Sequence, residues 1–175
     1  LNLRSSNWWN EQSVSWHGFF MTSDDEDENS DDVIGTHFTF PNYPFRASGH
    51  WVRTGDNFNP ALGFVRRRGV KSTGLGFTYY FEQPENELLE DISVGAEYDR
   101  YEWLDGDLDS DELEINLIGI RTLAGDFLGL EVEFERDILQ EPFEIIDEVI
   151  IPSSEYKGID FELEFRSSSN RPVFG

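Results

Sequence analysis

The chain contains three histidines, and their spacing could bring them together as ligands for a metal ion. His17, His37 and His50 fall at the same parity in three successive segments of alternating polarity. A two-residue turn at 43–44 would put His37 opposite His50, and a symmetric acidic loop centred near residue 27 would put His17 opposite His37. Directly opposed residues in an antiparallel sheet have Cβ atoms about 5 Å apart. Three such imidazoles predict a zinc-type site with one open position, although a row of wet polar side chains would align in the same way.

A second candidate is the acidic run 105–112, in which aspartates recur at every second position. The run resembles a calcium-binding loop at its first, third and fifth positions. Ser110 stands where such a loop needs glycine, however, and Asn116 stands where it needs the closing glutamate, so an EF-hand is not expected. Looser binding of a divalent cation is the alternative to a solvated outer loop. The candidate ligands are Asp105, Asp107, Asp109 and Asp111.

The segment Arg53–Gly69 combines turn-forming residues with three consecutive arginines. Its conspicuous positions are Asp56, Asn57, Phe58, Asn59, Pro60, Arg66, Arg67 and Arg68. Arginine forks pair well with phosphate, as in lipopolysaccharide, and with carboxylates. Because 36 acidic residues face only 13 Lys and Arg, we expect these arginines to pair within the protein.

Acidic side chains also alternate with apolar ones in three segments of the C-terminal half. The acids that share one parity are Glu112, Glu114, Glu131, Glu133, Glu135, Asp160, Glu162 and Glu164. Burying unpaired carboxylates would cost several kcal/mol each. Their face must therefore meet bulk solvent or line a water-filled lumen, while the opposite face is apolar enough to meet lipid.

The elements that would position these side chains are β-strands. Period-two alternation, which is typical of half-buried strands, recurs about nine times, and no segment has a convincing helical period. The connections 24–32, 55–68, 104–110 and 137–156 are mostly long or acidic, whereas 41–44, 123–126 and 167–172 are short and 83–89 is intermediate. These two kinds alternate, so one rim of a hairpin array would carry short turns and the other long loops. That asymmetry is typical of outer-membrane barrels. We therefore predict an all-β, antiparallel up-and-down meander that forms part of a transmembrane outer-membrane β-barrel.

Composition narrows the classes of function. The 175 residues suffice for one domain, carry a net charge of −23 and include no cysteine. Such negative charge argues against nucleic acid as a partner, and the lack of cysteine removes disulfides, thiol nucleophiles and Cys-based zinc sites. No apolar run approaches the roughly 20 residues of a membrane helix, a test that does not detect barrel strands. We find no G-x-S-x-G, P-loop or H-E-x-x-H motif, and we expect no enzymatic activity.

Several motifs together resemble those of a known family. They are Gly55-Asp-Asn-Phe-Asn-Pro-Ala-Leu-Gly-Phe-Val-Arg67, Glu141-Pro-Phe-Glu-Ile145, Ile151-Pro-Ser-Ser-Glu-Tyr156 and Ser167-Ser-Ser-Asn-Arg-Pro172, preceded by Asn7-Trp8-Trp9. In this order they are similar to the C-terminal β-barrel domain of unknown function in bacterial proteins with an N-terminal family-9-like carbohydrate-binding module. The resemblance implies a bacterial outer-membrane location, contact with lipid, and carbohydrate as a partner of the missing module. It implies no catalytic residue and no cofactor.

We thus expect residues 1–175 to form a single β-barrel domain, a fragment of a larger barrel. The favoured function is a channel, transport or envelope-anchoring barrel with an acidic lumen. One alternative is a β-sheet that binds carbohydrate through exposed aromatic residues, with Trp8, Trp9 and Trp103 as candidates. The other alternative is a hydrolase tethered to the cell envelope.

Overall fold

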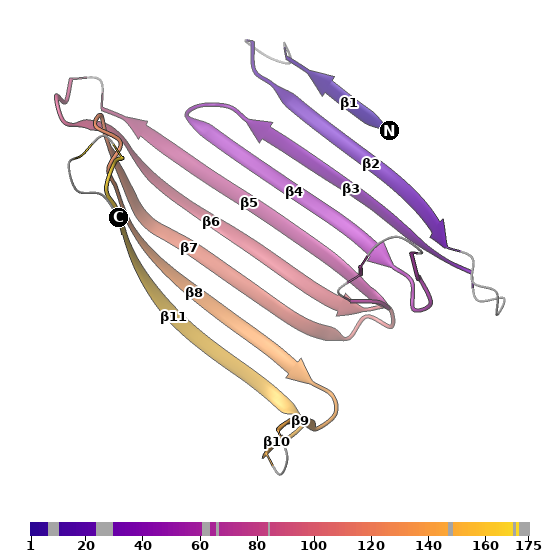
Figure 1. Cartoon of the computed structure of the whole chain (residues 1–175). Coiled ribbons are helices and arrows are strands. Elements are labelled where there is room, and N and C mark those ends of the chain that lie inside the picture. The colour runs from indigo at the N-terminus through magenta and orange to yellow at the C-terminus, as the bar shows by residue number, and fades with distance from the viewer. Residues whose placement is uncertain are drawn as a thin grey trace.

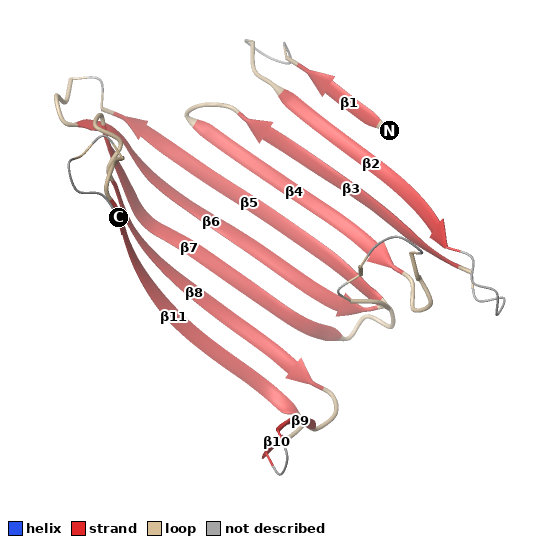
Figure 2. Ribbon diagram, in the orientation of Figure 1, coloured by secondary structure: helices blue, strands red, loops and turns tan. Residues whose placement is uncertain are grey.

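The computed structural model describes residues 1–6, 11–23, 30–60, 64–65, 67–83, 85–146, 149–169 and 171. All regular structure in these residues is β-strand, as Figure 2 shows. One antiparallel sheet contains β1 (Asn2–Ser5), β2 (Val14–Ser23), β3 (Asp31–Pro41), β4 (Phe45–Thr54), β5 (Val70–Glu82), β6 (Leu89–Trp103), β7 (Leu108–Thr122), β8 (Phe127–Leu139) and β11 (Ser154–Arg166). β9 (Phe143–Ile146) and β10 (Val149–Ile151) pair in a separate hairpin. The predicted all-β up-and-down meander of about nine strands is confirmed. No helix in the described part of the chain is long and apolar enough to cross a membrane.

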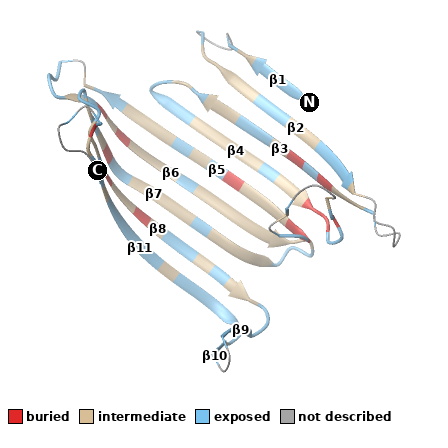
Figure 3. Cartoon of the chain, viewed as in Figure 1, coloured by how far each residue is buried: buried red, intermediate tan, exposed pale blue. Residues whose placement is uncertain are grey.

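The sheet is a single layer that bends along its C-terminal strands (Figure 1). Very little of it is buried (Figure 3): the buried apolar residues among those described are Val33, Phe58, Val70 and Val132. No described side chain is less than 2% exposed. Large apolar residues of the strands are exposed instead, for example Phe161 at 74%. The sheet is therefore not held together by a hydrophobic core of its own.

Both edges of the sheet are open within the described residues. β1 pairs only with β2, and β11 pairs only with β8, so the first and last strands do not close the sheet on itself. The two edges differ in length, because β1 has 4 residues and β11 has 13. The long edge strand presents a row of backbone N–H and C=O groups that no strand of the described sheet pairs.

The two rims of the sheet carry different connections, with two corrections to the prediction. Residues 55–69 form a long connection, and 140–153 form another that contains the unpredicted β9–β10 hairpin. The β6–β7 connection, expected at 104–110, is only the turn 104–107, because β7 already begins at Leu108. The acidic loop expected at 24–32 ends before Asp31, which begins β3; its residues 24–29 lie outside the described part.

One strand departs from the predicted alternation. Unbroken alternation after Leu113 and Ile115 would place Leu117 on the same apolar face. The register of β7 against β8 shifts between Asn116 and Ile118, so Leu117 is an extra residue in a β-bulge. Beyond the bulge the parity is reversed, and Ile118 opposes Leu130. The sequence signal for this bulge was two consecutive apolar residues, Leu117 and Ile118, in an otherwise alternating segment.

A group of buried residues lies at the long-loop rim. Val33, Thr54 and Val70 oppose one another across β3, β4 and β5, and all three are buried. The β4–β5 connection folds over the ends of these strands (Figure 1), and its Phe58 is only 4% exposed. This loop is fixed at its start, because the Asp31 carboxylate accepts a hydrogen bond from the Asn57 N–H at 2.9 Å.

Candidate functional site: the polar face of the sheet

Opposed residues form continuous rows that run across the sheet, and alternate rows belong to opposite faces. We call the face that carries the histidines and the alternating acids the polar face. One of its rows contains Ser15, Thr39, Ser48, Gly76, Glu97, Glu114, Glu133 and Asp160. The next row contains His17, His37, His50, Gly74, Asp99, Glu112, Glu135 and Gly158. Both rows change from neutral or imidazole side chains on β2–β5 to carboxylates on β6–β8, and the first row continues with Asp160 on β11.

The eight predicted acids share this face, on the side opposite Leu130 and Phe161. Glu131 opposes Glu162, and Glu164 lies two residues further along β11. All eight side chains are exposed or half-exposed in the structure. The predicted parity is therefore confirmed, and whether the face lines a lumen stays a prediction.

Three of these acids come close together. Glu112, Glu133 and Glu135 are the one group of described His, Cys, Asp or Glu residues in which three ligand atoms lie within 4.8 Å of one another. Exposed carboxylates form such clusters without an ion, so the cluster alone does not identify a metal site. It does concentrate negative charge at the centre of the acidic half of the face.

The three histidines have the predicted register, but their rings do not converge. His17 opposes His37, and His37 opposes His50. The rings of His37 and His50 stack with centroids 6.2 Å apart and planes 7° apart, whereas the His17 ring stacks on Phe19. The three do not form a described group with ligand atoms within 4.8 Å. The metal site stays a prediction, and this arrangement of the rings does not favour it.

His50 makes its polar contacts across β5, through the space that Gly74 leaves open. Its Nε2 lies 2.8 Å from Ser72 Oγ and 3.8 Å from the Asp99 carboxylate. A Cβ on Gly74 would come within 2.2 Å of the His50 ring and 2.5 Å of the Asp99 carboxylate. Serine and aspartate approach the same ring nitrogen, whereas a catalytic triad needs one on each nitrogen. This constellation gives the hydrolase alternative no support.

Three of the four candidate carboxylates of the acidic run 105–112 have separate partners in the structure. Asp105 accepts a hydrogen bond from the Asp107 N–H at 3.0 Å within the turn. Asp109 and Asp111 lie in β7 and are matched by different arginines, Arg67 and Arg136. The four carboxylates are absent from the described three-ligand groups. Two of them act as partners in ion pairs, so divalent-cation binding by the run stays a prediction without geometric support.

The arginine-containing segment 53–69 makes contacts within the protein, as expected. Besides Asp109, Arg67 donates to Ser110 Oγ at 2.9 Å and lies over the Tyr101 ring at 4.5 Å. Arg68 donates to the Asn59 side chain at 3.0 Å. The Asn59 N–H donates to Ser23 at 2.9 Å, and Pro60 is half-buried while Asp56 is exposed. Arg66 lies outside the described residues, as do Trp8 and Trp9.

The opposite, apolar face has bands of different polarity. On β8 and β11 its rows pair Phe134 with Ile159, Val132 with Phe161, Leu130 with Leu163 and Leu128 with Phe165. Toward the long-loop rim the same face becomes charged, with Arg53 bonded to Asp32 at 2.7 Å and Arg100 to Glu102 at 2.6 Å. The apolar rows are thus bordered by ion pairs on the rim side.

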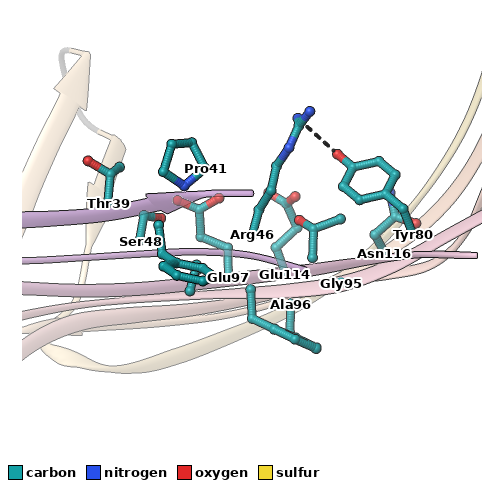
Figure 4. A pocket seen from close by; sticks show the side chains of 15 residues that line it. Thr39, Pro41, Arg46, Ser48, Tyr80, Gly95, Ala96, Glu97, Glu114 and Asn116 are labelled. Carbon is teal, nitrogen blue, oxygen red and sulfur yellow. Dashed lines mark hydrogen bonds between the residues drawn. The ribbon is translucent and has the colours of Figure 1, made fainter. Parts of the chain in front are cut away.

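A groove of about 340 Å³ lies on the polar face over β3–β7. Figure 4 shows Ser48, Glu97 and Glu114 on the side toward which the sheet curves, with Ala96 on the other side. Arg46 donates to the Tyr80 hydroxyl at 3.2 Å and lies 4.8 Å from the centre of its ring. The polar face is therefore concave here.

The list of candidate acids drawn from the sequence missed Glu97 and Asp99, which continue the two acidic rows onto β6. Their parity within the alternating segment of β6 was the available signal.

Comparisons of the chain with protein-family models, with curated proteins and with solved structures give no match. The resemblance to a barrel domain associated with a carbohydrate-binding module stays a prediction.

Proposed function

We propose that this chain is part of an outer-membrane β-barrel whose polar face lines an acidic, water-filled lumen that favours cations. The observation that carries the proposal is the pairing of two unlike faces on a sheet one layer thick. One face exposes rows of large apolar side chains, and the other exposes rows of carboxylates.

The apolar face suits lipid better than water. Exposed fractions on β11 are 59% for Ile159, 74% for Phe161 and 72% for Leu163, and no second layer formed by the described residues covers them. Contiguous exposed apolar patches of this kind are rare on soluble monomers and mark contact surfaces. Ion pairs border the apolar rows on the rim side. They are expected where the hydrocarbon of a bilayer gives way to head groups, because long basic side chains can reach water there at low cost.

The polar face requires water. Glu114, Glu133 and Asp160 oppose one another across three strands without a base in that part of the row. A dry interior would make each unpaired carboxylate cost several kcal/mol. A hydrated lumen removes that cost, and a surface rich in carboxylates attracts cations and repels anions.

The open edges fit the same proposal. A lipid-exposed strand edge leaves backbone groups without hydrogen bonds, so a spanning sheet must close into a barrel. In the proposed barrel, further strands pair with the β11 edge and with the β1–β2 edge. The expected architecture is therefore a larger barrel to which these nine strands contribute one wall.

Planar-bilayer recording of the full-length protein tests this proposal. In a potassium chloride gradient the reversal potential is expected to have the sign of a cation-preferring pore. Anion preference, or no conductance after verified insertion, would contradict an open acidic lumen. A full-length protein that stays monomeric in buffer without detergent would contradict the lipid-facing surface.

A further inference from the structure

We infer that the long-loop rim carries a binding site for a neutral saccharide, in a cavity between the strand ends and the β9–β10 hairpin. The cavity has a volume of about 560 Å³, within the range of small-molecule sites. Residues that define its chemistry are Arg67, Trp103, Asp109, Asp137, Phe143 and Tyr156. They come from the β4–β5 loop and from five different strands. This inference goes beyond the proposed channel and does not depend on it.

Three aromatic rings give the cavity its apolar surfaces. Trp103 ends β6 and Tyr156 lies in β11, so both belong to the main sheet, whereas Phe143 begins β9 and is paired only within the β9–β10 hairpin. The Tyr156 hydroxyl donates to the Pro152 carbonyl at 2.8 Å, which leaves its ring to make contacts. Phe143 is 57% exposed and Tyr156 is 37% exposed. Rigid, partly exposed rings provide contact area at a low cost in conformational entropy, and the C–H faces of a sugar ring match them.

Polar groups beside the rings can form the hydrogen bonds that the hydroxyl groups of a saccharide need. The Arg67 guanidinium is held between Asp109, Ser110 and the Tyr101 ring. Asp137 is exposed, and no hydrogen bond or ion pair joins its carboxylate to another described residue. An ionised carboxylate accepts several hydrogen bonds and donates none. Asp137 is therefore available to accept bonds from two neighbouring hydroxyl groups.

Charge and polarity select among possible occupants. Arg67 is already neutralised by Asp109, so the free charge in the cavity is that of Asp137. Glu112 and Glu135 line an adjoining cavity that shares Arg67 and Asp137, which adds negative charge nearby. Anionic ligands would be repelled. A purely apolar ligand would cover Asp137 and leave its carboxylate without hydrogen bonds, which is unfavourable. A neutral, polyhydroxylated ring meets both constraints.

Isothermal titration calorimetry of the full chain in detergent tests the site. The probes are maltose, cellobiose and lactose, with galacturonic acid as the anionic comparison. At least one disaccharide is expected to bind saturably and more tightly than galacturonic acid. Asp137→Asn keeps the side-chain shape and should weaken that binding roughly tenfold or more. Phe143→Ala, at an exposed position of the hairpin, should weaken it by a similar factor.

Matched controls lie elsewhere on the sheet. Asp160→Asn removes a carboxylate from the polar face outside the cavity, and Tyr43→Ala removes an exposed aromatic ring at the opposite rim. Both should bind like the wild type. No binding of any disaccharide at its solubility limit would overturn the inference. Tighter binding of galacturonic acid, or equal weakening by test and control variants, would overturn it as well. None of these results bears on conductance, so failure here is distinct from failure of the channel.

Discussion

Phe161 and Glu162 are neighbours in β11, yet they belong to surfaces of opposite chemistry. Phe161 opposes Val132 and stands in the apolar rows, whereas Glu162 opposes Glu131 and stands in the acidic rows. Both side chains are exposed, so neither is held by a core. In a two-layer protein one of these faces would be buried against a second layer. Here each face must be stabilised by what surrounds it, and the two surroundings must differ.

The largest predicted effect comes from placing the same charge on each face. In phospholipid vesicles, Phe161→Arg is expected to destabilise the folded full-length protein by about 2–4 kcal/mol if the position lies near the bilayer midplane. The matched variant Glu162→Arg should cost less than about 1 kcal/mol, because it adds a base beside Glu131 in a wet row. Urea unfolding in vesicles measures both. Equal costs for the two variants would contradict the assignment of the faces.

A second comparison uses one glycine from each face. Gly74→Ala pushes a Cβ into the space shared by His50 and Asp99, and we expect a loss of about 1–2 kcal/mol from overpacking and a broken hydrogen bond. Gly49→Ala on the apolar face meets the end of the flexible Leu75 side chain at 3.2 Å and should be close to neutral. The same unfolding assay applies. If the cost of Gly74→Ala persists in a His50→Ala background, the contact across β5 is not its cause.

The stability contributed by an ion pair at the short-turn rim should depend on pH. In the β7–β8 turn, hydrogen bonds from the Arg171 guanidinium and the Ser168 N–H lower the pKa of Asp126 from 3.8 to about 2. Because the pKa is lower in the folded state, the stabilisation is fully present above about pH 4 and is lost as the pH falls through about 2. Asp126→Asn and Arg171→Gln should each remove it. Their stability differences from wild type are expected to shrink between pH 4 and pH 2, and differences that stay constant over that range would refute the linkage.

The smallest predicted effect concerns the acidic half of the polar face. Neutralising the cluster with Glu112→Gln and Glu135→Gln together should lower the cation-to-anion permeability ratio by a factor of about two, since other carboxylates remain in the same rows. Glu141→Gln, outside the strands of the sheet, serves as the control. Bilayer recordings of both proteins give the comparison. An unchanged ratio in the double variant would mean that this part of the face does not meet the ion path.

Local pattern was sufficient to predict most of the sheet. The turn around Tyr43-Pro44 and a symmetric acidic loop fixed the pairing of β2, β3 and β4 to the residue, because antiparallel register follows from the centre of each connection. The bulge at Leu117 was missed, since one inserted residue leaves only a shift in the phase of an otherwise regular pattern.

Side-chain geometry was harder to predict than register. Correct pairing placed His17, His37 and His50 in one row. The His17 ring, however, stacks on Phe19, and the His50 ring contacts Ser72 and Asp99. The β9–β10 hairpin was expected to be loop because Phe143–Ile146 is short and lacks strict alternation. The rim cavity depends on that hairpin, so Trp103 and Tyr156 could not be joined into one site from sequence.

Collision accessibility of nitroxide labels along β8 tests the central claim most directly. These 175 residues contain no cysteine, so single cysteines at positions 130–135 add the first thiols to this part of the protein. In the full-length protein reconstituted in vesicles, labels at Leu130, Val132 and Phe134 should be reached best by oxygen dissolved in lipid. Labels at Glu131, Glu133 and Glu135 should be reached best by a water-soluble nickel complex. Preferential access of the nickel complex at all six positions, or an alternation of the opposite phase, would contradict a sheet with lipid on one face and water on the other.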